Sequence, residues 1–186
     1  MSAQPTLETA RLRLRAFAPA DAAEVQRLAG DRRVADTTLN IPYPYPDGAA
    51  ETFIASQAEA FAAGTGATFA VTDAATGALV GACGMNITPR LAHAEMGYWI
   101  APDHWGHGYA TEAARAVLGY AFGALALHRV YARHLTRNPS SGKVMRKLGM
   151  RHEGRQRDHV LKWGRFEDLE VYGILLDEWK AAERQG

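Results

Sequence analysis

The stretch Asp103-His-Trp-Gly-His-Gly-Tyr-Ala-Thr-Glu-Ala113 joins the end of an apolar strand to the start of a long amphipathic helix. Gly106 and Gly108 have no Cβ, so the backbone can turn tightly and bring its amides against an anion, while the small Ala110 leaves the next amide unshielded. The helix that follows adds unpaired amides and the positive end of its dipole. We interpret this stretch as a phosphate cradle.

Two common phosphate-binding motifs do not fit the cradle. A dinucleotide-binding Gly-x-Gly-x-x-Gly needs Gly or Ala where this chain has Thr111, and no clear acidic ribose ligand ends the next strand. A nucleoside-triphosphate loop needs a Lys-Ser or Lys-Thr pair after the glycines, and this chain has none there. A plain tight turn remains the alternative, because glycine is the default turn residue.

Length and composition predict one cytoplasmic domain over residues 1–186. The chain has 21 Lys and Arg against 20 Asp and Glu, so nothing indicates a nucleic-acid or membrane-seeking surface. Residues 1–9 do not resemble a leader peptide, and no segment approaches the roughly 20 apolar residues of a membrane span. The single cysteine, Cys83, cannot form an internal disulfide, and its apolar strand predicts a buried structural thiol.

Hydrophobic periodicity predicts the elements around the cradle. The alternating run Arg11-Leu-Arg-Leu-Arg15 is typical of a half-buried strand, and the prolines over 40–46 require an extended loop. The other expected elements are a short helix opened by Pro19 and Asp21, a helix from Asp47 to Gly64, strands near 68–72, 79–87 and 92–101, a helix over 108–122, a strand over 129–135, a helix over 140–148 and two final strands hinged at Gly164. This order predicts an α+β fold, with a mixed sheet flanked by helices.

The cradle and five further motifs along the chain resemble one family. Read from Trp105, the spacing x-x-x-Gly108-x-Ala110 resembles the coenzyme A pyrophosphate loop of the GNAT superfamily of N-acetyltransferases. Asn138, Ser141 and the pair Leu148-Gly149 resemble the superfamily's second helix. Further stretches resemble the ribosomal-protein-alanine N-acetyltransferase-like (RimJ/RimL-like) branch: Thr9-Ala-Arg-Leu-Arg-Leu-Arg15, Pro42-Tyr-Pro-Tyr-Pro46, Gly97-Tyr-Trp99 and Trp163-Gly-Arg-Phe-Glu-Asp168.

The resemblance implies a central, mostly antiparallel sheet of about seven strands, splayed between the strand ending near Ala101 and the strand from Arg129. The pantetheine arm of acetyl-CoA would enter the gap and pair with free backbone groups of Tyr98, Trp99 and Ile100. A continuous, fully paired sheet is the alternative. The other cofactor-binding residues that it implies are Trp105, Gly106, His107, Gly108, Tyr109, Ala110, Thr111, Asn138, Ser141 and Lys143, with Trp105 packing on the loop.

The resemblance places a general base at Glu95, in the run Ala94-Glu-Met96. An alkyl amine with a pKa of about 10 is mostly ammonium at neutral pH, so a carboxylate that accepts its proton, directly or through water, assists the reaction. A solvent-facing carboxylate on an edge strand is the alternative for Glu95.

The leaving thiolate lacks its usual partner, because Met145 stands where many relatives carry a tyrosine. The branch suggests Ser141 instead, with its hydroxyl bonded to the coenzyme sulfur, and a thiol with a pKa of about 8.5 is a fair leaving group without a strong acid. Capping of the helix by Ser140 or Ser141 is the alternative. On the acceptor side, Tyr43, Tyr45 and Trp163 are expected to bind substrate, although Trp163 also fits a core position.

We therefore expect an acetyl-CoA-dependent N-acetyltransferase that joins amine and thioester in one ternary complex. The acceptor is expected to be a protein N-terminus or a small-molecule amine, and many relatives form homodimers. A non-catalytic coenzyme A-binding sensor and a nucleotide-binding regulator are the alternatives. No metal is expected, because the seven histidines lack metal-ligand spacing and a cysteine partner.

Overall fold

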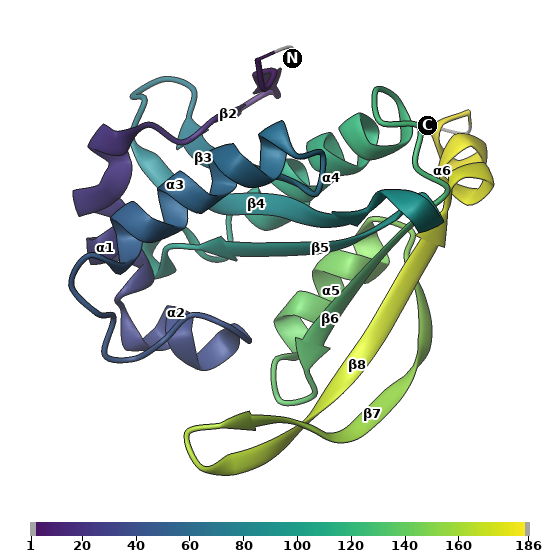
Figure 1. The fold of residues 1–186 in the computed structure, drawn as a ribbon. Coiled ribbons are helices and arrows are strands. Elements are labelled where there is room, and N and C mark those ends of the chain that lie inside the picture. The colour runs from purple at the N-terminus through teal and green to yellow at the C-terminus, as the bar shows by residue number, and fades with distance from the viewer. Residues whose placement is uncertain (1–2, 185–186) are drawn as a thin grey trace.

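The computed structural model describes residues 3–184 and is organised around one eight-stranded sheet with the order β1-β2-β3-β4-β5-β6-β8-β7 (Figure 1). The strands are β1 (Leu7–Glu8), β2 (Leu12–Arg15), β3 (Gly66–Asp73), β4 (Leu79–Thr88), β5 (His93–Ile100), β6 (Arg129–Leu135), β7 (Arg151–Lys162) and β8 (Arg165–Leu175). The helices are α1 (Ala22–Ala29), α2 (Arg32–Thr37), α3 (Ala49–Ala62), α4 (Tyr109–Phe122), α5 (Pro139–Lys147) and α6 (Leu176–Glu183).

All neighbouring strands are antiparallel except β5 and β6, which are parallel. The predicted α+β fold with a mostly antiparallel sheet is confirmed. The expected number of about seven strands becomes eight because the two-residue β1 joins the edge of the sheet. That residues 1–186 form one domain stays a prediction.

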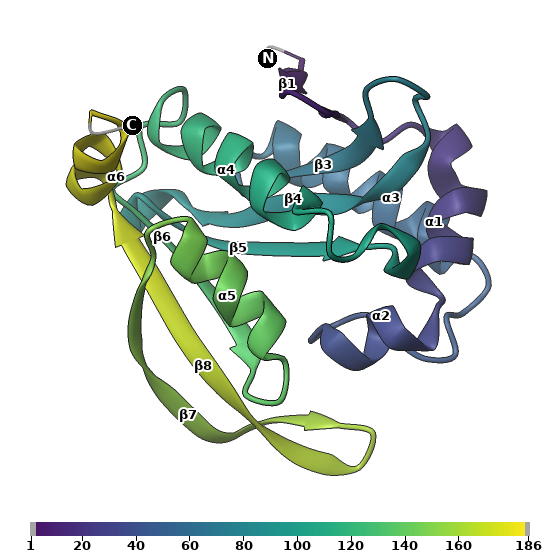
Figure 2. The ribbon, with the colours of Figure 1, turned by 180° about the vertical axis from the view of Figure 1, so that it is seen from behind.

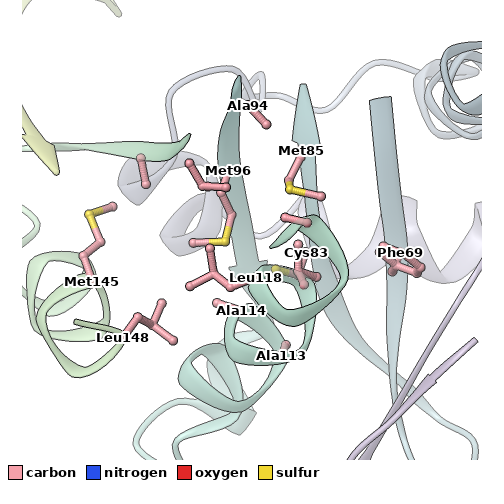
Figure 3. Packing of buried hydrophobic residues seen from close by; sticks show 14 of the residues in the cluster. Phe69, Cys83, Met85, Ala94, Met96, Ala113, Ala114, Leu118, Met145 and Leu148 are labelled. Carbon is pink, nitrogen blue, oxygen red and sulfur yellow. The ribbon is translucent and has the colours of Figure 1, made fainter. Parts of the chain in front are cut away.

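The helices cover the sheet in two layers. α4 and α5 lie on one face and α1 and α3 on the other, as the two opposite views show (Figures 1 and 2). On the α4 side, the small residues Ala113, Ala114 and Ala121 are fully buried, which allows the helix backbone to approach β4 and β5. Cys83, Met85 and other side chains of these strands fill the space beneath α4 (Figure 3). The amphipathic helix expected over 108–122 and the buried Cys83 are confirmed.

Sequence patterning missed two short helices. α2 begins at Arg32, where the sequence predicted no element, because Asp31 accepts a hydrogen bond from the amide of Arg33 and caps the helix. The final expected strand pair is followed by α6, whose Trp179 stacks on Phe122 at 5.9 Å between ring centroids. Within residues 3–184, none of these helices combines the length and apolar character that crossing a membrane requires.

The sheet opens between β5 and β6. Their pairing starts at His93 and Arg129 and stops at Met96 and Ala132, although β5 continues to Ile100 and β6 to Leu135. The two strands diverge beyond this point in both views (Figures 1 and 2). The splay that the resemblance implied is therefore confirmed, and it creates an open strand edge inside the molecule.

Candidate active site

A cleft of about 710 Å³ lies where β5 and β6 separate. β4, β5, β6 and α5 form its walls, the segment over 104–111 borders one side and α2 with the following loop borders another. Its charged lining consists of one acid, Glu95, and three bases, Arg133, Lys143 and Lys147. This lining favours a ligand with an anionic part.

The cradle has the backbone that its glycines predicted. Gly106 and Gly108 have φ of 81° and 82°, a region in which residues with a Cβ are strained. A Cβ at Gly106 would meet no atom within 4 Å, so the glycine leaves open space there. No side chain caps α4, and among the residues that the structure describes the six amides of residues 106–111 have no hydrogen-bond acceptor. These free amides suit an anion.

The N-terminal strand holds the cradle in place. Arg11 donates to the carbonyl of His107 at 3.0 Å, and its guanidinium lies 4.9 Å from the ring centre of Tyr109. The same guanidinium donates from Nε and Nη2 to Oε2 of Glu112, whose Oε1 accepts from the hydroxyl of Thr9 and the amide of Arg11. Burial raises the pKa of Glu112, but the hydrogen bonds from Thr9 and Arg11 outweigh it and hold that pKa below its ordinary value.

At the open edge of β5, the backbone of one residue is already hydrogen-bonded and the backbone of another is free. Backbone groups of alternate residues point to opposite sides, and the amide of Ala101 bonds to Val80 in β4. Tyr98 and Ile100 therefore direct their backbone groups toward the cleft. The indole of Trp105 donates to the carbonyl of Ile100 at 2.6 Å. This bond joins the loop at Trp105 to the end of β5, and Tyr98 remains the open part of the edge.

Glu95 lies in the cleft as half of an ion pair. Its side chain is 23% exposed, and Arg133 donates from Nε to Oε1 at 2.8 Å and from Nη2 to Oε2 at 3.0 Å. The hydroxyl of Tyr131, directly opposite Glu95 in β6, donates to Oε2 at 3.3 Å. The carboxylate is therefore fixed in one orientation, and Arg133 is a site residue that sequence patterning did not find.

Ser141 and Tyr98 connect the two walls of the cleft. The phenolic oxygen of Tyr98 lies 2.8 Å from Ser141 Oγ and donates to the Ser141 carbonyl at 3.2 Å. Burial raises the pKa of Tyr98 well above its ordinary value, and the bond to Ser141 only partly offsets this. Met145, a residue of α5, is buried in the core, as Figure 3 shows.

Asn138 fastens two helices together. Its Oδ1 lies 3.4 Å from the amide of Ser141 at the start of α5, and its Nδ2 donates to the carbonyl of Thr37 at the end of α2. Three side chains donate to three consecutive backbone carbonyls at the end of α2. The bonds run from Arg137 to Asp36, from Asn138 to Thr37 and from Lys162 to Thr38. They fix the end of α2, whose Val34 and Thr37 line the cleft.

The three expected acceptor-side aromatic residues lie outside the cleft. Tyr43 and Trp163 contact each other at 6.1 Å between ring centroids and are about half exposed beside Arg32. Tyr45 packs against α1, where burial raises its pKa. The lining of the cleft includes Tyr98, Trp99, Ile100, Trp105, Gly106, Gly108, Tyr109, Ala110, Thr111, Asn138, Ser141 and Lys143, but not His107.

His134 is a further cleft residue without an expected role. It is 6% exposed, its Nδ1 donates to the carbonyl of Leu135 at 2.8 Å, and its Nε2 has no partner within the described part of the chain. Its position in β6 carries no sequence motif, so patterning had no signal for it. Residues 3–184 contain no cluster of three His, Cys, Asp or Glu side chains that could hold a metal ion.

Comparisons with known proteins converge on one family. A family model described as an acetyltransferase (GNAT) domain matches residues 11–151. "Uncharacterized N-acetyltransferase p20" from Bacillus licheniformis is 34% identical over 105 residues, which cover 56% of this chain and 59% of the relative. The chain spans about half the length of the curated relatives that it matches.

Solved structures share the fold along nearly the whole chain. The GNAT-family acetyltransferase from Bacillus anthracis has a TM-score of 0.83 and 26% identity, covering 93% of this chain and 99% of that one. A structure described as RimL, a ribosomal L7/L12 α-N-protein acetyltransferase in complex with coenzyme A, has a TM-score of 0.86 and 16% identity, covering 94% and 99%. At 16% identity, the similarity to RimL concerns the fold alone.

Proposed function

Because this chain belongs to the GNAT family of N-acetyltransferases, we propose that it transfers the acetyl group of acetyl-CoA to a primary amine. The observation that carries the proposal is the row of free amides over 106–111 beside the open edge of β5. Helix N-termini with such amides bind phosphate, so these residues would hold the coenzyme diphosphate. Tyr98 would offer its backbone to the pantetheine arm, and Lys143 stands in the same cleft for anionic groups.

Glu95 fits the role of the base. Acetyl-CoA supplies an activated thioester carbonyl, and the acceptor must lose a proton before its nitrogen can attack. The carboxylate of Glu95 would take this proton, directly or through water. Arg133 and Tyr131 support the assignment because they fix the carboxylate at the cleft without covering it: its side chain keeps 23% of its exposure.

The acceptor that the site supports is the single amine of a protein N-terminus or a small molecule. Among the described residues that line the cleft Glu95 is the one acid, so it is the one carboxylate there that an acceptor amine can approach. One sequence relative, from Bacillus subtilis, is named a putative ribosomal N-acetyltransferase, which supports testing N-terminal peptides first. The amine and the thioester would meet in one ternary complex, in which positioning supplies much of the rate.

A non-catalytic coenzyme A-binding module is the second candidate. Two observations favour it: Arg133 and Tyr131 already occupy both oxygens of Glu95, and the buried Met145 replaces the tyrosine that many relatives carry. Such a module would keep the cradle without needing a base.

A thiol-release assay with acetyl-CoA, N-terminal peptides and simple amines separates the candidates. We expect acceptor-dependent thiol release, and we expect Glu95→Gln to lower kcat about 100-fold with unchanged acetyl-CoA binding, since general bases contribute at least this much. Glu153→Gln is the matched control, because Glu153 is paired with Arg129 on β6 but lies outside the cleft lining. Tight coenzyme binding without acceptor-dependent release would establish the binding module instead.

A further inference from the structure

We infer that the side chain of Tyr98 is a positioning group for the departing thiolate, because its hydroxyl directs the single proton of Ser141 toward the coenzyme sulfur. The inference deepens the proposed function and rests on it. It assigns to a side chain of β5 part of the work that a tyrosine at position 145 would otherwise perform.

The geometry places Tyr98 behind Ser141. Tyr98 lies two residues beyond the last pair between β5 and β6, at Met96, and its ring packs against the core on the α4 and α5 side. Its hydroxyl crosses to α5 and reaches both Ser141 Oγ and the Ser141 carbonyl, at 2.8 and 3.2 Å. Both residues line the cleft. A group bound between β5 and α5 would therefore meet Ser141 with Tyr98 already bonded to it.

Two hydrogen-bond arrangements are available without moving any heavy atom. Each hydroxyl has one proton and can also accept. In the first arrangement Tyr98 donates to the Ser141 carbonyl, and Ser141 donates to the Tyr98 oxygen. In the second, Tyr98 donates to Ser141 Oγ, and the proton of Ser141 is free to point into the cleft. Negative charge on a sulfur atom in the cleft favours the second arrangement, because bonds to charged acceptors are the stronger ones.

Tyr98 keeps its own proton throughout. Burial raises the pKa of its phenol far above neutrality, so the group acts as a hydrogen-bond donor and not as a source of protons. In the transfer step the acceptor nitrogen bonds to the acetyl carbon, that carbon's bond to sulfur breaks, and the electron pair stays on sulfur. The proton that the nitrogen loses after bonding passes to water, because Glu95 has already taken the proton that the ammonium group lost before the attack. Ser141 stabilises the sulfur charge through a hydrogen bond whose geometry Tyr98 sets.

Without the phenol, Ser141 has a competing partner. A serine in a helix readily turns its hydroxyl to the carbonyl one turn earlier, which for Ser141 belongs to Arg137 or Asn138. The bond from Tyr98 holds Oγ on the cleft side. Replacement of Tyr98 by phenylalanine keeps the ring and its packing but removes this restraint.

The test is an optical titration of the thiol of coenzyme A bound to the protein. We expect the bound thiol to ionise about one pKa unit below its free value near 8.5, and Tyr98→Phe to remove most of that shift. Burial also raises the pKa of Cys83, so neither Cys83 nor Tyr98 ionises in the same range. Ser141→Ala should abolish the shift, and Tyr98→Phe should add nothing in the Ser141→Ala background.

The control and the contrary results are well defined. Tyr120→Phe removes a partly buried phenol of α4 that packs on Phe69 away from the cleft lining, and it should leave the thiol pKa unchanged. If the bound thiol had the same pKa in Tyr98→Phe as in the unaltered protein, the inference would be overturned while the proposed function stands. If Tyr98→Phe fails to fold, an unchanged thiol pKa in Ser141→Ala overturns it equally. Failure of the unaltered protein to bind coenzyme A would instead remove the proposed function.

Discussion

Gly142 in α5 lies against the buried ring of His134. A Cβ at this position would be 2.7 Å from His134 Nε2 and 3.2 Å from Cε1. The ring has little freedom to move, because Nδ1 donates to the carbonyl of Leu135 and the ring stacks on Tyr172 at 5.7 Å between centroids. The glycine is therefore required by close packing of α5 on β6.

Gly142→Ala should destabilise the protein, whereas Gly119→Ala should stabilise it. Alanine gains about 0.5–1 kcal/mol over glycine inside a helix, but overpacking costs about 1–3 kcal/mol, so the net loss at Gly142 is about 1 kcal/mol. Gly119 lies inside α4 with no atom within 4 Å of an added Cβ, so only the gain applies there. Urea unfolding measures both changes. Equal stabilisation by the two substitutions would show that the His134 ring yields freely.

Single residues were predictable where the chemistry is local. The positive φ of Gly106 and Gly108 follows from the glycines themselves, and the patterning found them. Arg133 was not predictable, because its role depends on the parallel pairing of β5 with β6, 38 residues apart in sequence. The neighbour that Ser141 finds in Tyr98, 43 residues away, was missed for the same reason.

At the scale of elements, the start of β2 and the first turn of α4 form one unit. Arg11 and Glu112 make a two-pronged ion pair, and Arg11 also holds the carbonyl of His107 inside the cradle. Glu112 has only 16% of its side chain exposed, whereas Arg11 is half exposed at 49%. We expect this contact to fix the shape of the cradle more than the stability of the fold, because exposed partners are screened by water.

Arg11→Met should raise the Michaelis constant for acetyl-CoA about fivefold, which corresponds to about 1 kcal/mol of binding, and lower stability by no more than a similar amount. The pKa of Glu112 is lowered in the folded protein, so the pair stabilises fully above the ordinary carboxyl pKa. The stability difference between the two proteins should therefore shrink below about pH 4, as Glu112 becomes protonated.

Arg13→Met is the control for this unit. Arg13 pairs with Glu8 on the same N-terminal segment, and both side chains are more than half exposed. The guanidinium of Arg13 donates to the carboxylate of Glu8 and not to the cradle. Acetyl-CoA kinetics and acid unfolding check both variants. A Michaelis constant raised as much by Arg13→Met as by Arg11→Met would show that the effect comes from net charge alone.

Elements whose hydrophobic pattern repeats several times were predicted well, whereas short helices marked only by a capping residue were not. The stripe of α4 and the alternation of β2 repeat often enough to be read from the chain. α2 has six residues, too few for a helical period, and only the capping Asp31 marks its start. α6 was missed because its apolar face depends on Trp179, whose partner Phe122 lies in α4.

At the scale of the molecule, the site depends on a sheet that pairs incompletely. Pairing of β5 with β6 over 93–96 and 129–132 holds the two halves together, and its loss beyond these residues opens the cleft. The sequence alone indicated strands on both sides but not where their pairing stops, because the pairing depends on the whole sheet. On the acceptor side, α2, fixed by Arg137, Asn138 and Lys162, borders the cleft. The expected aromatic residues do not line it, and their role in substrate binding stays a prediction.

Calorimetric titration of coenzyme A tests the account most directly, with Gly106→Ala and Gly77→Ala compared against the unaltered protein. Gly106 and Gly77 have φ of 81° and 75°, and an added Cβ meets no atom within 4 Å at either, so alanine imposes similar backbone strain at both. We predict one binding site, unchanged affinity in Gly77→Ala, and affinity lowered at least about tenfold in Gly106→Ala, because two displaced amide contacts to phosphate exceed 1.4 kcal/mol. Absence of binding by the unaltered protein, or equal affinity of the two variants, would contradict the account.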